Sequence, residues 1–179
     1  MTTPFHISYA WVPRDKPLDF EPSDYEDWSA LFRTMRRLIA LHRGIFTLQI
    51  GERELRYFFA PDLSTIFEEL PAALTALAAG PQATASIDFF EQGTEQLLML
   101  ARSGPELAIE VYTGNQTQSR PPERFVVAVH EFLGAWADFG QAILAALAEL
   151  EPAIGADEGF RQYATDLAAV KAAVPGNAA

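Results

Sequence analysis

The sequence of 179 residues contains no cysteine. This absence excludes disulfide bonds, thiolate nucleophiles and thiolate zinc sites, and it suits a reducing cytoplasm. Histidine is nearly as scarce, since the chain has only His6, His42 and His130. No two of them are spaced to share a helix face as metal ligands. The sequence therefore predicts no metal site and no cofactor.

Long apolar runs are also missing. The richest run, Leu70–Gly80, contains Pro71 and stops after about ten residues, whereas a membrane-spanning helix needs about 20. The first fifteen residues have neither the basic nor the apolar region of a secretory signal. We therefore expect a cytoplasmic protein that does not enter a membrane.

Basic residues are outnumbered by 24 acids to 13 bases, which gives a net charge of −11. Residues 57–118 hold eight acids and one arginine, Arg102, so this segment alone carries −7. Such a field repels nucleic acid and speeds encounter with a basic protein, although the same charge can serve solubility alone. A small basic cluster consists of Arg33, Arg36, Arg37 and Arg43, but no aromatic RNA-binding motif accompanies it. We expect no nucleic-acid partner.

Hydrophobic periodicity predicts a single domain over residues 1–179 with an α+β fold. The predicted strands are residues 5–11, 45–50, 53–59, 83–91, 94–102 and 106–113. The predicted helices are residues 23–43, 61–80 with an interruption at Pro71, 125–150 and 157–173. The resulting order is βαββαβββαα. Because short turns join most strands, we expect a mainly antiparallel sheet of five to six strands with helices on one face and the other face open.

Short motifs predict where two helix ends and two turns lie and which side of one strand is buried. Ser23 to Glu26 has the form of a capping box, which predicts a helix start, and Gly44 is a plausible helix stop. Gly51-Glu52 between two strand patterns predicts a type II′ hairpin. In the stretch "SIDFFEQGTE", alternation predicts that Ile87 and Phe89 face the core and that Gln92-Gly93 makes a turn.

The sequence contains no signature of catalysis. It has no GxSxG elbow, no GxxxxGK[ST] loop and no GxGxxG loop. Asp88 and Glu91 form a possible carboxylate pair, but alternation predicts that Asp88 is solvated, and a solvated carboxylate is a poor general acid at neutral pH. We therefore predict no catalytic residue. A small enzyme remains an alternative, and it requires a pocket that holds His130 or Asp88 beside a second titratable group. A structural or adaptor subunit is another.

The open sheet face is the best candidate for function. It should display Asp88, Phe90, Tyr112 and either Glu106 or Glu110, and Phe58 is a further candidate for the same face. Aromatic anchors among carboxylates suit a protein interface, because the rings are buried on binding and the acids steer a basic partner. The alternative is that helices cover Phe58 and Phe90.

The order of motifs over residues 83–150 resembles the immunity proteins of bacterial polymorphic-toxin systems. The resemblance rests on "DFFEQG", then the strand patterns "QLLML" and "ELAIEVY", then "PERFVVAVHEFLGAWADF". It implies a non-enzymatic cytosolic protein that neutralises one cognate toxin by direct binding, with no catalytic residues. The expected partner is a basic toxin domain, for example a nuclease whose site accepts phosphate. The predicted partner-binding residues are Asp88, Phe90, Glu91, Glu95, Glu110 and Tyr112.

Overall fold

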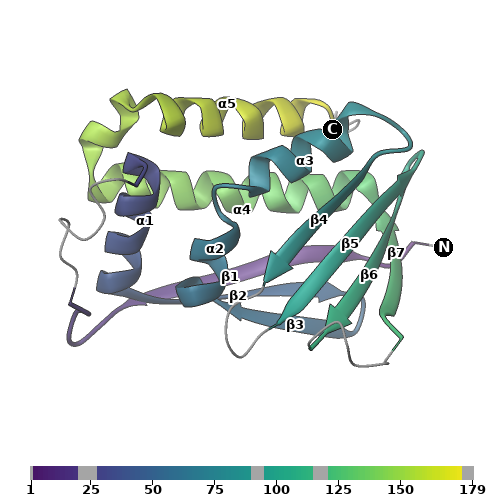
Figure 1. Cartoon of the computed structure of the whole chain (residues 1–179), viewed down its shortest axis with the longest axis horizontal. Coiled ribbons are helices and arrows are strands. Elements are labelled where there is room, and N and C mark those ends of the chain that lie inside the picture. The colour runs from purple at the N-terminus through teal and green to yellow at the C-terminus, as the bar shows by residue number, and fades with distance from the viewer. Residues whose placement is uncertain (1, 20–27, 90–94, 115–120, 175–179) are drawn as a thin grey trace.

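The computed structural model describes residues 2–19, 28–89, 95–114 and 121–174. Its strands form two antiparallel sheets, ordered β1-β2-β3 and β4-β5-β6-β7 (Figure 1). The strands are β1(Phe5–Pro13), β2(His42–Ile50), β3(Arg53–Phe58), β4(Thr84–Phe89), β5(Gln96–Ser103), β6(Glu106–Thr113) and β7(Glu123–Ala128). The α+β class is confirmed. The prediction of one sheet with five to six strands is wrong, because the described residues form a three-stranded and a four-stranded sheet.

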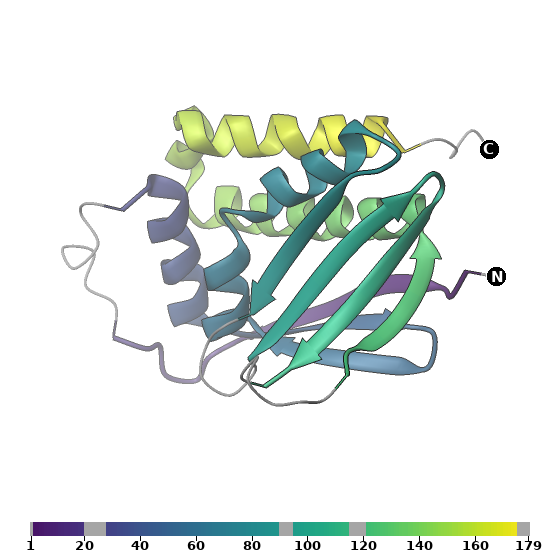
Figure 2. The ribbon, with the colours of Figure 1, turned by 45° about the vertical axis from the view of Figure 1, so that its right-hand side comes forward.

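The helices pack in two layers on one side of the sheets (Figures 1 and 2). The helical elements are α1(Ala30–Leu41), η2(Phe59–Leu63), α2(Ser64–Ile66), α3(Leu70–Ala79), α4(Val129–Leu150), η3(Pro152–Ala156) and α5(Glu158–Ala172). Helix α4 contacts β1, β6 and β7, and α5 packs on both α3 and α4. None of the helices in the described ranges combines the length and the hydrophobicity that a membrane crossing requires.

The core is centred on aromatic side chains where the two sheets meet α4. Phe46 of β2 lies 6.2 Å from Phe89 of β4 and 5.1 Å from Phe139 of α4, measured between ring centroids. Tyr57 of β3 stacks on Phe89 at 4.0 Å. All four rings are buried. The prediction that Phe89 faces the core is therefore confirmed, and Phe89 connects the core sides of the two sheets.

The last strand of the four-stranded sheet, β7, was not predicted from the sequence. We predicted a helix from Phe125, because Phe125 continues the apolar stripe of Val129, Phe132 and Trp136 at helical spacing. The structure instead pairs Glu123–Ala128 with β6, and the helix begins at Val129. The segment includes the β-branched pair Val126-Val127, and pairing with β6 satisfies its backbone hydrogen bonds. This extra strand changes the predicted order of elements.

Helix α1 begins later than predicted. Its N-cap is Ser29, whose hydroxyl accepts a hydrogen bond from the backbone N–H of Phe32 at 3.0 Å. The capping box at Ser23 lies outside the described residues. The helix ends at Leu41, and β2 begins at once with His42. Gly44 is therefore not a helix stop. It lies in β2, where a Cβ would overlap the ring of Phe59.

Two other local predictions are confirmed. Strands β2 and β3 form a hairpin in which Ile50 pairs with Arg53, and Gly51 has the positive φ of 60° that the first central position of a II′ turn requires. Pro71 lies in the first turn of α3, where its missing N–H costs nothing, and the segment before it is a separate short helix. The predicted helix 61–80 is thus divided near its proline.

Candidate functional site

None of the described helices covers the outer face of the four-stranded sheet. Figure 2 shows this face turned toward the viewer with no helix across it. The alternation of the strands turns Ile87, Leu98 and Ile109 inward, where they are buried. The residues between them point outward. Three rows of paired residues cross this face: Asp88–Leu97–Tyr112, Ser86–Met99–Glu110–Arg124 and Thr84–Ala101–Ala108–Val126. We call this surface the β4–β7 face.

The structure brings together three of the predicted partner-binding residues. Asp88 and Tyr112 lie on either side of Leu97, to which both are paired, and Glu110 belongs to the next row. Glu95 directly precedes β5 and is exposed. Its φ of 38° is unusual for a residue other than glycine and is typical of a turn.

The other two predicted binding residues, Phe90 and Glu91, lie outside the described residues, as does the predicted Gln92-Gly93 turn. The site is therefore described from Asp88, Glu95, Glu110 and Tyr112.

The charges on the β4–β7 face are not equivalent. The carboxylate of Glu110 accepts a hydrogen bond from the Tyr112 hydroxyl at 2.8 Å and forms an ion pair with Arg124 at 2.9 Å. The hydrogen bond to Glu110 raises the pKa of Tyr112. No side chain in the described part of the chain pairs with Asp88. The uncompensated negative charge therefore lies at Asp88 and Glu95, while Glu110 is already neutralised.

The apolar part of this face was missed at the sequence level. Met99 is 42% exposed, and the half-buried Leu97 lies two residues before it on β5, on the same face. Val126 is 39% exposed and lies on β7, in the next row of this face. The stretch "QLLML", residues 96–100, did indicate apolar residues on the outer face. A strand with one solvated face normally alternates, so an uninterrupted apolar run in an antiparallel sheet indicates apolar residues on the outer face as well. Uncovered apolar clusters of this kind mark interaction surfaces.

Phe58 is exposed, at 51%, but it does not belong to the β4–β7 face. It lies on the outer face of the three-stranded sheet, in a row with Ile45 and Ala10. The expectation that Phe58 shares a surface with Asp88 and Tyr112 is wrong, because β3 pairs with β2 and not with any strand of the second sheet. Leu55, Tyr57 and Phe59, which alternate with Arg56 and Phe58, are buried.

The three histidines belong to three different elements, β1, β2 and α4, and none of them is in β4, β5, β6 or β7. His6 is exposed, and the Nδ1 atom of His42 lies 3.2 Å from the carbonyl of Leu38, which is a helix-end contact. His130 lines a pocket of about 330 Å³ with Arg102, Gly104, Pro105 and Val129.

The only ionisable side chains among the described residues that line the pocket at His130 are Arg102 and His130 itself. The guanidinium of Arg102 donates to the carbonyls of Leu77 and Gly104, and neither a carboxylate nor a hydroxyl side chain is among the residues that line the pocket. This pocket does not bring His130 beside Asp88. The described ranges contain no group of three or more side chains arranged to hold a metal ion.

Comparison with protein-family models, with curated proteins and with solved structures gave no match to this chain.

Proposed function

We propose that this protein is a non-enzymatic binding protein that recognises a basic protein partner through the β4–β7 face. The observation that carries the proposal is a sheet face that no described helix covers, on which the apolar Leu97 and Met99 lie beside Asp88, whose carboxylate pairs with no side chain of the described residues. Apolar side chains at the centre of an interface supply most of its affinity, and charges at its rim act mainly on the rate of association.

The charge distribution supports a basic partner. The β4–β7 face comes largely from residues 57–118, the segment with a net charge of −7. Asp88 and Glu95 contribute charge that no arginine or lysine of the described residues neutralises. A field of this sign attracts a positively charged domain over a distance of about 10 Å at moderate salt.

The partner that we propose is a toxin domain, and the chain would then act as its immunity protein. The motif resemblance over residues 83–150 is the reason for this choice. If the toxin is a nuclease, its active site is basic because it accepts phosphate, and the carboxylates of the immunity protein would occupy the position of the phosphates.

The test is a kinetic binding measurement between this protein and the toxin encoded beside its gene. The double substitution Asp88→Lys with Glu95→Lys should lower the association rate constant several-fold at low salt and change the dissociation rate little. Met99→Ser removes an apolar contact at the centre of the face and should raise the dissociation rate constant.

Two matched controls separate this face from the rest of the surface. Glu149→Lys makes the same kind of charge change on α4, and Phe58→Ser removes an exposed apolar side chain from the other sheet. Neither should change the rate constants. Equal effects of Met99→Ser and Phe58→Ser, or an association rate that does not respond to the double charge reversal, would contradict the proposed interface.

A further inference from the structure

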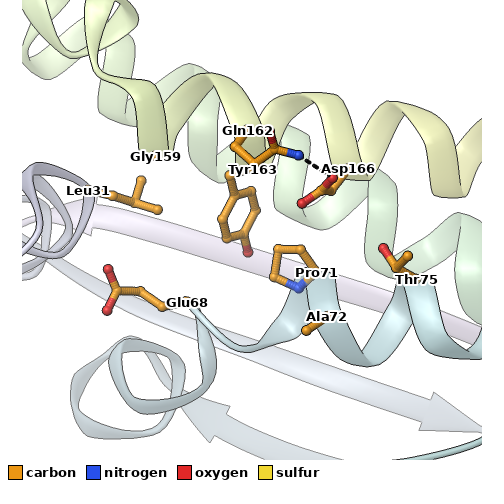
Figure 3. Close-up of a pocket in the computed structure, with 9 residues that line it drawn as sticks. All are labelled: Leu31, Glu68, Pro71, Ala72, Thr75, Gly159, Gln162, Tyr163 and Asp166. Carbon is orange, nitrogen blue, oxygen red and sulfur yellow. Dashed lines mark hydrogen bonds between the residues drawn. The ribbon is translucent and has the colours of Figure 1, made fainter.

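A second pocket lies between α1, α3 and α5, on helices rather than on the sheets. Its volume is about 560 Å³, within the range of small-molecule sites. Figure 3 shows Glu68 and Pro71 on one side, and Gln162, Tyr163 and Asp166 of α5 on the other. The wall is mainly apolar, with a few polar groups, as is usual for sites that bind organic molecules.

The charged side chains that line this pocket are acidic. Glu68 and Asp166 line it, and no arginine, lysine or histidine is among its lining residues. One oxygen of Glu68 accepts a hydrogen bond from the Ser29 hydroxyl, and Asp166 accepts one from the Gln162 amide at 2.8 Å. These are neutral donors, and within the described part of the chain no arginine, lysine or histidine forms an ion pair with either carboxylate.

Tyr163 provides an independent observation. Tyr163 is only 4% exposed and its ring stacks on Phe67 at 4.6 Å, yet its hydroxyl has no hydrogen-bond partner among the residues that the structure describes. Figure 3 shows this hydroxyl on the pocket side of the ring, directed toward the strip between Glu68 and Pro71. Burial and, secondarily, the charge of Glu68 raise the pKa of Tyr163, so the hydroxyl stays protonated. A buried hydroxyl without a partner is costly, and native proteins usually satisfy such groups.

We propose that this pocket binds an organic cation that consists of an alkylammonium or alkylguanidinium group on an aliphatic stem. The stem would lie against Leu31, Pro71 and Ala72. The charged end would donate hydrogen bonds to Glu68 and to the oxygen of Tyr163, and Asp166 would attract it from the opposite wall. Such a group occurs both in free polyamines and in the arginine and lysine side chains of proteins.

The test uses nuclear magnetic resonance titration of the full chain at low and high salt. The probes are agmatine, which has one ammonium and one guanidinium end, and a short peptide with blocked ends whose only charged side chain is a single arginine. We expect at least one probe to shift the backbone amides of Thr75, Gln162 and Tyr163. Shifts with agmatine alone indicate a free small molecule, and shifts with the peptide alone indicate a protein side chain.

Substitutions then test the site itself. Glu68→Gln and Asp166→Asn should each weaken binding about tenfold or more, since each removes a charge-assisted contact. Ala72→Phe adds a ring to an exposed lining position and should abolish binding without disturbing the core. Tyr163→Phe should weaken binding while the fold is retained. The control is Glu69→Gln, because Glu69 is an exposed neighbour of Glu68 that does not line the pocket.

Several results would overturn the proposal: no shifts with either probe, binding that survives both Glu68→Gln and Ala72→Phe, or an equal loss of affinity with Glu69→Gln. The last result would mean that the probes respond to overall charge and not to the pocket. The inference does not depend on the β4–β7 face, and neither Met99→Ser nor the reversal of Asp88 and Glu95 is expected to remove cation binding at the pocket. Failure of one proposal therefore leaves the other standing.

Discussion

At the residue scale, Gly44 is needed for packing and not for backbone freedom. It lies near the start of β2, paired with Trp11 of β1, where a Cβ would overlap the buried ring of Phe59. We expect Gly44→Ala to lower the free energy of unfolding by about 1–3 kcal/mol, because a large enclosed ring cannot move aside without strain. Urea unfolding measures this change.

The matched control is Gly134→Ala in α4. A Cβ at Gly134 meets no atom within 4 Å, and alanine favours a helix over glycine by about 1 kcal/mol. This second variant should therefore be as stable as the parent chain or more stable. Equal destabilisation by both substitutions would show that the Phe59 contact is not the reason for glycine at position 44.

Tyr57 and Tyr163 should make the protein sensitive to alkali. Burial raises the pKa of both, with smaller contributions from Asp62 at Tyr57 and Glu68 at Tyr163. The unfolded chain loses these protons near pH 10, while the folded chain keeps them, so the unfolded state binds fewer protons above that pH. Their stabilisation is thus complete below about pH 10 and decreases as the pH rises further, by up to about 1.4 kcal/mol per pH unit for each tyrosine.

The measurement is urea unfolding at a series of pH values above neutrality, with Tyr163→Phe as the comparison. This variant should lose stability less steeply in alkali. At neutral pH it should be slightly more stable than the parent, because it removes a buried hydroxyl to which no described residue is hydrogen-bonded. Identical slopes for the two proteins would contradict the assignment.

At the scale of elements, α1 and α5 each begin at a side-chain cap. The Ser29 hydroxyl accepts from Phe32 N–H, and the Asp157 carboxylate accepts from Phe160 N–H, both at 3.0 Å. We expect Ser29→Ala and Asp157→Ala each to lower stability by about 1 kcal/mol, with an unchanged dependence on denaturant. Asp157→Asn keeps the acceptor and should cost less than the alanine variant. If the asparagine and alanine variants were equally unstable, the cap would not be the cause.

The boundary between β7 and α4 shows the limit of periodicity at this scale. Phe125 and Val129 are four residues apart, so a helix through both would present them on one face. In the structure Phe125 belongs to a strand and Val129 to a helix, and both still contact the same core. The apolar pattern did not distinguish one continuous helix from a strand followed by a helix. In both arrangements the residues before and after position 128 bury their side chains in the same core.

At the scale of the whole molecule, one aromatic core connects the two sheets. Phe89 stacks on Tyr57 of the other sheet, and the Tyr57 hydroxyl donates to Gln96 at 2.7 Å. We therefore expect both sheets to unfold together, with coincident transitions in far-ultraviolet and near-ultraviolet circular dichroism. Phe89→Ala should lower the free energy of unfolding by about 3–5 kcal/mol.

The control for Phe89→Ala is Phe58→Ala, in which the same side chain is removed from an exposed position. A change within about 0.5 kcal/mol is expected there. Two separate transitions in the parent chain would mean that the sheets fold independently, and they would contradict the single-domain prediction.

Part of the candidate site could be read from the sequence. Alternation along a strand is local, so "SIDFF" and "ELAIEVY" correctly separated the buried Ile87, Phe89 and Ile109 from the outward Asp88 and Tyr112. The hairpin at Gly51 and the break at Pro71 were predictable for the same reason, because backbone conformation there depends on the residue itself.

Only the tertiary structure decided which outward residues lie together. Phe58 and Tyr112 each occupy an outward position in a strand of alternating residues, yet they belong to different sheets. Which sheet a strand joins depends on pairing with strands that are distant in sequence. The ion pair that neutralises Glu110 requires Arg124 on β7, a strand that local periodicity did not distinguish from a helix. The pocket at Tyr163 forms where α1, α3 and α5 meet. The sequence by itself determined which side of each strand is buried, because that property repeats every two residues. Packing between distant elements determined the composition of each surface.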